Sequence, residues 1–236
     1  MDKIKTISLF SSAGIGELRT RNLNIDVVAA NELLPQRAAC YRHFYPETVM
    51  VCDDITKAST KGTMIKYAND NNTKLLIATP PCQGLSTLGK NKVQDHYEKD
   101  RRNFLILEAL EVIDNCDFDY ILIENVPKFI EMYFPFNDEY MLLEDILKLK
   151  YSDTYEISVN VLNAKDYGIC QSRPRAIIRL YKKGLKWSLP KTEEEIPLKD
   201  AIGHLPSLES GETSEIPWHF AKKENSRAVL AMKHTA

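Results

Sequence analysis

The chain has 236 residues, of which 44% are hydrophobic and 27% are charged. These fractions are ordinary for a globular protein, and the length suits one domain with or without a small appendage. The formal net charge of −2 excludes a globally basic nucleic-acid binder, so any contact with DNA must rely on local basic clusters.

The cysteines are five in number, scattered, and without a CxxC pair. This pattern argues against both a disulfide framework and a zinc site, so we expect no metal. It fits a reducing cytoplasm, and no apolar run approaches the ~18 residues of a membrane span. We therefore expect a cytoplasmic protein with no membrane partner.

The first predicted strand, residues 4–10, runs into a turn that holds Gly14 and Gly16, with a helix expected after it. A strand, a glycine-containing turn and a helix form a cradle typical of nucleotide sites, because glycine lets the backbone approach a ligand. The pattern is weak evidence on its own, since many α/β turns contain two glycines.

A second strand is predicted for residues 26–31 and is followed by Glu32. An acidic residue just past the second strand is well placed to take both hydroxyls of a ribose. The alternative is a solvated surface glutamate. A helix is expected at 36–45, and Asp54 is a candidate cap for the helical stretch that follows it.

The apolar run Leu75–Ala78 is short and rich in branched residues, which predicts a buried strand of a parallel sheet. Pro80 and Pro81 cannot donate to a ladder, so the strand must stop there. Cys82 then lies at the carboxyl end of a central strand, where open α/β sheets bind ligands. On position alone, a nucleophile and a buried small hydrophobe are equally good interpretations of this cysteine.

The polar segment 84–100 is predicted to be a loop, and a helix is expected to follow it through about Ile113. Basic residues gather on or just after this loop, where they can meet phosphates or be merely solvated. They are Lys90, Lys92, Lys99, Arg101 and Arg102.

The next apolar run, residues 118–123, is predicted to be a strand that ends at Glu124. A carboxylate at the tip of a buried strand is costly unless it has a partner or a task, which favours a functional role. Within residues 128–150 a helix is predicted after an aromatic loop that contains Tyr133, Phe134 and Phe136, and these aromatic side chains are expected in the core.

A strand at 155–162 and a final strand at 176–180 are predicted to pair antiparallel across the turn between them. Arg173 and Arg175 are two residues apart, so they point to the same side of an extended segment. Two guanidinium groups on one side suit a phosphate or a base carbonyl. The alternative is a surface ion pair.

Three motifs in this order resemble those of the cytosine-C5 DNA methyltransferase family: Pro81-Cys82-Gln83, Glu124-Asn125-Val126 and the segment 171–175. The resemblance implies a Rossmann-like α/β fold dependent on S-adenosylmethionine, with a mostly parallel sheet and an antiparallel strand pair near its end. It implies a catalytic domain at 1–184. The proline-rich and acidic stretch 185–236, with a short helix near 199–205, would then be a loop-rich extension toward an absent target-recognition domain.

The resemblance also implies catalytic roles. Cys82 would add to carbon 6 of a flipped cytosine, and Glu124 would protonate or hydrogen-bond ring nitrogen 3. Arg173 would hold the base carbonyl, with Arg175 beside it. Substrate contacts are expected from Gln83, Ser86, Asn125 and Gln171.

In the family, a Phe-x-Gly-x-Gly turn holds S-adenosylmethionine, which leaves as S-adenosylhomocysteine. Phe10 and Gly14 match this turn, while Ser12 stands where the first glycine is usual. Asp54 and Ile55 resemble the segment that contacts adenine. The residues expected at the cofactor are Phe10, Ser12, Gly14, Ile15, Glu32, Leu33, Asp54, Ile55, Pro80, Asn103 and Leu105.

The implied function is bacterial DNA (cytosine-5-)-methylation of the restriction-modification type, with double-stranded DNA as substrate. We expect a second subunit that carries target recognition, poor activity of this chain alone, and an exposed apolar face; a truncated chain is the alternative. A tRNA cytosine-C5 methyltransferase and a non-catalytic nucleic-acid or partner-binding homologue also stay open.

Overall fold

The computed structural model describes residues 3–81 and 101–233. By their contacts the residues form two compact units. The first unit contains residues 1–163 and 173–190, and the second contains residues 164–172 and 191–236. The predicted boundary between Gly184 and Leu185 stays a prediction.

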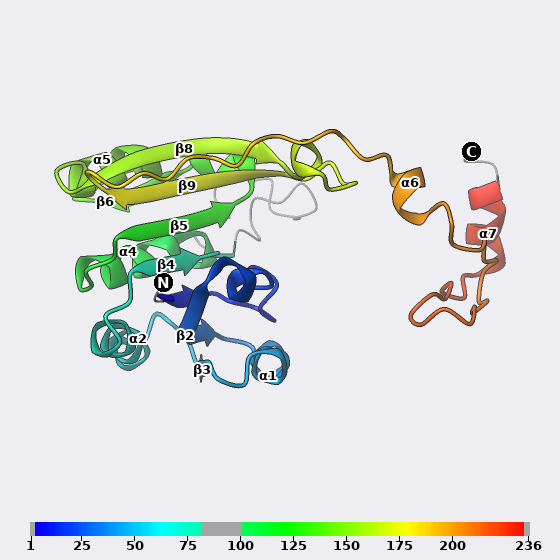
Figure 1. The fold of residues 1–236 in the computed structure, drawn as a ribbon, viewed down its shortest axis with the longest axis horizontal. Helices are drawn as coiled ribbons and strands as arrows, with labels where there is room; N and C mark the ends of the chain where they lie inside the picture. The colour runs from blue at the N-terminus through cyan, green and yellow to red at the C-terminus, as the bar shows by residue number, and fades with distance from the viewer. Residues whose placement is uncertain (1–2, 82–100, 234–236) are drawn as a thin grey trace. The chain divides into compact units, whose positions relative to one another are not determined.

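The first unit is built on a seven-stranded sheet of order β3-β2-β1-β4-β5-β9-β8 (Figure 1). Its five neighbouring strands from β3 to β5 are parallel, whereas β9 is antiparallel to both β5 and β8. The fold prediction is therefore confirmed. The strands are β1 (Ile4–Leu9), β2 (Ile25–Glu32), β3 (Val49–Cys52), β4 (Leu75–Ala78), β5 (Tyr120–Asn125), β8 (Tyr155–Asn163) and β9 (Pro174–Lys182).

The helices of the first unit connect these strands. They are α1 (Pro35–Phe44), α2 (Ala58–Asp70), α4 (Ile106–Asp114) and α5 (Leu143–Tyr151), with 3-10 turns η1 (Thr20–Leu23), η2 (Arg101–Phe104) and η3 (Pro127–Glu131). The prediction of a helix directly after β1 was wrong. A series of turns and η1 occupy that stretch instead.

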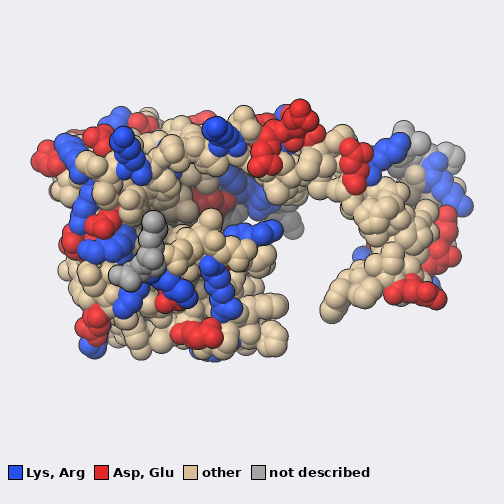
Figure 2. All heavy atoms as spheres, viewed as in Figure 1, with Lys and Arg blue, Asp and Glu red and all other residues tan. Residues whose placement is uncertain are grey.

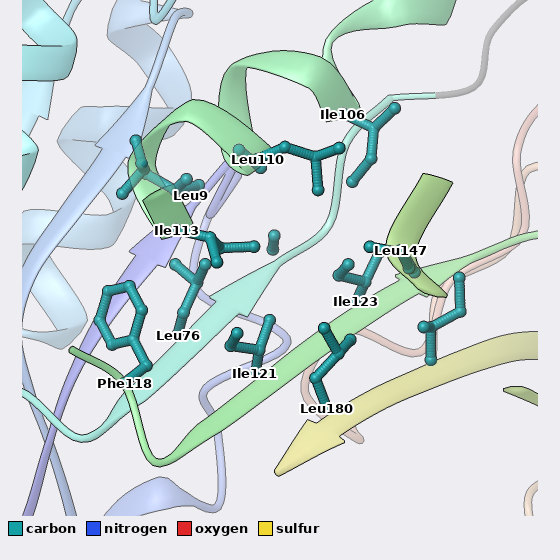
Figure 3. Packing of buried hydrophobic residues seen from close by; sticks show 14 of the residues in the cluster. Leu9, Leu76, Ile106, Leu110, Ile113, Phe118, Ile121, Ile123, Leu147 and Leu180 are labelled. Carbon is teal, nitrogen blue, oxygen red and sulfur yellow. The ribbon is translucent and has the colours of Figure 1, made fainter. Parts of the chain in front are cut away.

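One face of the sheet is covered by α2, α4 and α5 and holds the main core. Figure 3 shows Leu110 and Ile113 of α4 lying over Leu76 and Ile121 of the sheet. Each large apolar side chain fully buried in such a core contributes roughly 1.5–3 kcal/mol. On the opposite face, α1 packs over β2 and β3 through Ala38 and Tyr41. On this face α1 does not cover the neighbouring strands β4, β5 and β9.

The helix expected within 128–150 is present as α5, but the prediction of an aromatic loop before it was wrong. Strands β6 (Tyr133–Phe136) and β7 (Glu139–Leu142) form an antiparallel hairpin before α5 begins. Asn137 and Asp138 connect the two strands with φ of 50° and 64°, as a two-residue hairpin turn requires. Of the aromatic side chains expected in the core, Phe134 is fully buried, while Tyr133 is 54% exposed.

The second unit contains η4 (Ala164–Tyr167), α6 (Leu198–Ile202) and α7 (Ser226–Lys233). The short helix expected near 199–205 is thus present. Within residues 191–233 no side chain is buried, and Trp218 is 92% exposed. Among the described residues, no helix is long and apolar enough to cross a membrane.

Candidate cofactor and base site

A cavity of about 830 Å³ lies against the sheet face opposite α4. Ile77, Leu122 and Ile177 from the adjacent strands β4, β5 and β9 form part of its wall. Side chains alternate along a strand, so these three face away from the core that Leu76 and Ile121 build. The predicted site residues that line the cavity are Phe10, Ser12, Ile15, Glu32, Leu33, Asp54, Ile55, Leu105, Glu124 and Arg173.

The turn after β1 has an unusual backbone. Phe10, Ser12 and Gly14 adopt φ of 61°, 52° and 83°. In this left-handed region a non-glycine residue costs roughly 1–2 kcal/mol, so Ser12 is strained where a glycine would not be. Gly14 has a second constraint, because a Cβ there would collide with the ring of Tyr45, whose hydroxyl donates to the Gly14 carbonyl at 2.7 Å.

Glu32 is the last residue of β2 and is 6% exposed. One carboxylate oxygen accepts the backbone N–H of Ser12 at 2.9 Å, and the other accepts that of Leu34 at 2.8 Å. A carboxylate offers about four lone-pair sites, so these bonds orient the group while leaving it able to accept more. The side chain is a fixed acceptor at the cavity wall, not a solvated surface glutamate.

Asp54 and Ile55 reach the cavity from the loop between β3 and α2. Asp54 Oδ1 accepts the backbone N–H of Thr56 at 2.9 Å, which fixes the loop. The residue flanking α2 is Lys57, with no side-chain cap, so Asp54 does not cap that helix. Its neighbour Asp53 instead bonds Lys57 and Thr60, and the Lys57 hydrogen bond holds the pKa of Asp53 below its usual range.

Glu124 and Arg175 form an ion pair, with Arg175 Nε donating to Glu124 Oε1 at 2.7 Å. Sheet register explains the contact. Glu124 pairs with Ile177, and Arg175 lies two residues before Ile177 on the same face. Both side chains are partly exposed, at 34% and 23%. Arg173 lines the cavity, and its backbone N–H is held by Asn163 Oδ1 at 2.8 Å.

Asn125 points to the opposite side of β5 from Glu124. Its Nδ2 donates to the carbonyl of Pro80 at 3.0 Å, and its Oδ1 accepts the Val126 N–H at 2.9 Å. Asn125 therefore ties the end of β5 to the segment that precedes Cys82. Thr79 adds a similar tie, because its hydroxyl donates to the Phe10 carbonyl at 3.0 Å.

The structure thus brings ten of the predicted residues to one cavity and places others around it. Gly14, Pro80, Asn103, Asn125 and Arg175 do not line the cavity. Gln171 belongs to the second unit. Cys82, Gln83 and Ser86 lie outside the described residues, as does the polar segment 84–100 with Lys90, Lys92 and Lys99.

The cavity wall also contains residues that were not predicted as site residues from sequence, among them Glu17, Arg37 and Thr79. Glu17 is 2% exposed, and burial raises its pKa above the ordinary value. A single glutamate in a polar turn carries no sequence pattern that distinguishes a buried carboxyl from a solvated one. Thr79 directly follows the predicted strand β4, so its position at the sheet edge was a usable signal.

Comparison with known proteins gives a consistent result. The family described as C-5 cytosine-specific DNA methylase matches residues 4–235. Type II methyltransferase M1.HgaI of Avibacterium volantium is 40% identical over 232 residues, which cover 98% of this chain and 65% of that protein. Type II methyltransferase M.AquIA of Picosynechococcus sp. is 31% identical over 191 residues, covering 79% of this chain and 75% of that protein.

Solved structures share the fold at lower identity. A candidate DNA modification methyltransferase encoded in an E. coli prophage superposes with a TM-score of 0.67 at 24% identity, covering 95% of this chain and 62% of that one. Entamoeba histolytica methyltransferase EhMeth gives 0.60 at 20% identity, covering 83% and 58%.

The chain spans 65% of M1.HgaI and 59% of M1.HphI of Haemophilus parahaemolyticus, so it matches part of these relatives. The family match itself runs over nearly all of this chain. The chain belongs to the C-5 cytosine-specific DNA methylase family.

Proposed function

We propose that this chain is the catalytic part of a DNA (cytosine-5-)-methyltransferase that uses S-adenosylmethionine. One observation carries the proposal. A single cavity is lined by the acidic pair Glu32 and Asp54 and also by Glu124 of the Glu124–Arg175 pair. Pro81, the residue before Cys82, lines the same cavity. A cofactor and a base could therefore meet beside the candidate nucleophile.

The cavity residues fit the cofactor. Glu32 offers fixed acceptor oxygens for ribose hydroxyls, and Asp54 offers an acceptor for an adenine amino group. Ile55 and Leu105 give apolar contacts for the flat base. S-adenosylmethionine supplies an activated methyl group when bound. The residues proposed to hold it are Phe10, Ser12, Gly14, Ile15, Glu32, Leu33, Asp54, Ile55, Pro80, Asn103 and Leu105, without a metal.

The proposed chemistry starts from a cytosine whose carbon 5 is not nucleophilic. The Cys82 thiolate would add to carbon 6, and electron density would move to carbon 5, which takes the methyl group. Glu124 would carry a proton and donate it to ring nitrogen 3, where negative charge develops, and would recover that proton when the thiolate leaves. Loss of the proton from carbon 5 and departure of the Cys82 thiolate would then release 5-methylcytosine.

Arg175 supports this assignment of Glu124, because its Nε already holds one carboxyl oxygen and leaves the other for the base. Arg173 lines the cavity and would hold the base carbonyl, as the resemblance implies. Gln83, Ser86, Asn125 and Gln171 remain proposed substrate contacts. For Asn125 the protein partners Pro80 and Val126 favour a positioning role within that set.

The proposed substrate is double-stranded DNA, and the target base must leave the stack to reach the cavity. The relatives named Type II methyltransferases favour a role in restriction-modification. A chromosomal substrate would place this activity in the bacterial cytoplasm. Lys and Arg are interspersed with Asp and Glu on the face of the molecule shown in Figure 2, so DNA binding would depend on local contacts.

We further propose that a second polypeptide supplies target recognition and completes the catalytic unit. Ile15, Leu33 and Leu34 line the cavity yet are 73%, 56% and 42% exposed, an apolar rim that a partner could cover. In the second unit, residues 191–233 have no buried side chain. Apolar contacts must offset ~1–2 kcal/mol of backbone entropy for each ordered residue, so this segment also favours a partner.

The test uses a DNA duplex with 5-fluorocytosine at target sites, S-adenosylmethionine, and this chain with or without an extract of its source. Fluorine cannot leave carbon 5 as a proton does, so a covalent protein–DNA adduct should accumulate. We expect the adduct only with the extract, and we expect Cys82→Ser to abolish it. Cys40→Ser is the matched control, because Cys40 is exposed and free.

Each outcome is informative. An adduct formed without the extract would contradict the need for a second polypeptide but not the chemistry. An adduct that survives Cys82→Ser would contradict the nucleophile. If the chain binds S-adenosylhomocysteine but no adduct forms on DNA under any condition, DNA is not its substrate.

A further inference from the structure

The turn after β1 combines strain with close packing, and this raises the question of what holds it in place. Phe10 and Ser12 are both non-glycine residues in the left-handed region. Such conformations persist only where the surroundings over-determine them. Glu32 holds the Ser12 N–H from the side of β2, and Tyr45, the residue directly after α1, holds the Gly14 carbonyl.

Glu17 holds the same turn from its far end. The Ser8 hydroxyl, near the end of β1, donates to Glu17 Oε1, and the Ser11 hydroxyl donates to Ser8 Oγ at 2.8 Å. All three side chains are at most 4% exposed. The Glu17 side chain thus closes the segment 8–17 into a loop, with the strained residues inside it.

The environment of Glu17 suits a neutral carboxylic acid. Its second oxygen, Oε2, is buried and has no hydrogen-bond partner among the described residues. An ionised carboxylate left unpaired in such a place would be strongly disfavoured. Burial accordingly raises the pKa of Glu17, although the hydrogen bond from Ser8 opposes the shift.

The titratable groups that face Glu17 are Tyr41 of α1 and Tyr45, which directly follows that helix. Burial raises the pKa values of Tyr41 and Tyr45, and negative charge on Glu17 would raise them further. Arg21 of η1 lies over the Tyr45 ring at 5.6 Å from its centroid, and its positive charge lowers the pKa values of both tyrosines. The tyrosines remain neutral well above neutral pH, so they do not charge in the range where Glu17 titrates.

We propose that Glu17 is a positioning residue that, in its protonated form, clasps the turn 10–14 in its ligand-binding shape and thereby sets the affinity for the cofactor. The inference rests on the proposed use of S-adenosylmethionine at this cavity. Glu17 lines the cavity together with Ser11 and Ser12, so a change in the clasp acts directly on the cofactor-facing backbone.

The test compares Glu17→Gln, Glu17→Ala and the unchanged chain, with Glu47→Gln as a control for a carboxylate on the surface of the same unit. S-adenosylhomocysteine binding is measured by calorimetry from pH 4.5, the ordinary pKa of a glutamate, to pH 9. We expect Glu17→Gln to bind within about threefold of the unchanged chain, because an amide also accepts from Ser8. We expect Glu17→Ala to bind about tenfold more weakly, since the Ser8 hydroxyl loses its acceptor.

The pH dependence separates the clasp from a charged contact. With a raised pKa, the contribution of Glu17 is complete below its ordinary value of 4.5 and is lost as the pH rises through the raised value. Affinity of the unchanged chain should therefore fall with rising pH, and that of Glu17→Gln should stay flat by comparison. The proposal would be overturned if the affinity of the unchanged chain for S-adenosylhomocysteine rose with pH and Glu17→Gln bound as weakly as Glu17→Ala. That result would show that the ionised carboxylate of Glu17 supports binding.

Thermal unfolding without ligand keeps the two proposals separable. The midpoint of the unchanged chain should fall with rising pH relative to that of Glu17→Gln, whether or not S-adenosylhomocysteine binds. Absence of binding by the unchanged chain at every pH would contradict the proposed function alone. Equal binding and equal midpoints for Glu17→Ala and the unchanged chain would contradict the clasp alone.

Discussion

Arg175, the second residue of β9, holds the carboxylate of Glu124, the fifth residue of β5, through a hydrogen bond of 2.7 Å from its Nε. The two strands are antiparallel neighbours, so an arginine entering one strand meets a glutamate leaving the other. The sequence interpretation gave Arg173 the principal role and Arg175 a secondary one. The pairing gives Arg175 a specific task, which is to orient Glu124.

We therefore expect Arg175→Ala to lower the rate of methyl transfer by about tenfold to a hundredfold, because a hydrogen bond to a charged group contributes ~1.5–3 kcal/mol. The measurement is a single-turnover assay with tritiated S-adenosylmethionine in the presence of source extract. Arg21→Ala is the matched control, since Arg21 pairs with Glu47 on the surface. An unchanged rate for Arg175→Ala would contradict this role.

Asn125→Ala should destabilise the first unit. The change leaves the Pro80 carbonyl and the Val126 N–H without their partners, and an unsatisfied buried group costs roughly 1–3 kcal/mol. The thermal midpoint should fall by about 4–8 °C for a loss of about 2 kcal/mol. Asn125→Asp keeps the acceptor for Val126 but not the donor to Pro80. Its thermal midpoint should therefore lie between those of Asn125→Ala and the unchanged chain. A midpoint for Asn125→Ala equal to that of the unchanged chain would show that neither bond matters.

Ser12→Gly should be tolerated and should stabilise the turn. Glycine adopts the φ of 52° at this position without the cost of a side chain, and the N–H that bonds Glu32 remains. We expect the free energy of unfolding, measured by chemical denaturation, to increase by up to about 1 kcal/mol. Binding of S-adenosylhomocysteine should be retained. Asn72→Gly, at a φ of 50° just after α2, is the control for a left-handed residue away from the cavity. Lost binding in Ser12→Gly alone would mean that the serine hydroxyl itself contacts the ligand.

Truncation of the two tryptophans should change the free energy of unfolding to different extents. Trp187 packs edge-on against Tyr120, and its carbonyl accepts from Arg179, which also lies over its ring. Trp187→Ala should lower the free energy of unfolding of the first unit by about 2 kcal/mol, since part of a large apolar contact is lost. Trp218→Ala should leave it unchanged, because Trp218 is 92% exposed. Equal effects in chemical denaturation would contradict the packing role of Trp187.

Several elements were predictable because local chemistry and fold agree. Strand β4 has the predicted bounds, since Leu75–Ala78 is apolar throughout and prolines follow closely. Strand β5 extends past the predicted end because Asn125 pairs with Ala176 of β9, a partner distant in sequence. The β6–β7 hairpin was missed although Asn137-Asp138 between two aromatic and apolar runs is a recognisable turn signal.

Site residues that belong to a sequence motif could be predicted. Those whose role depends on burial in the folded structure could not. Glu32 and Glu124 lie at the carboxyl ends of strands and Asp54 follows one, and such residues gather at one edge of a parallel sheet. The bond from Asn125 to Pro80 depends on a side chain turning away from the cavity, which a motif does not reveal. The buried carboxyl of Glu17 depends on how the turn folds back on Ser8, and no local pattern encodes that.

The ring of Trp187 also bears on where this protein can be cut. A fragment that ends at Gly184 would lack Trp187. The side chains of Tyr120 and Arg179, which Trp187 contacts, would then be more exposed to solvent and prone to nonspecific association. Ending the fragment after Pro190 keeps those aromatic contacts within the piece that is made. A fragment for crystallisation or for fusion to a foreign DNA-reading module should therefore carry these extra residues.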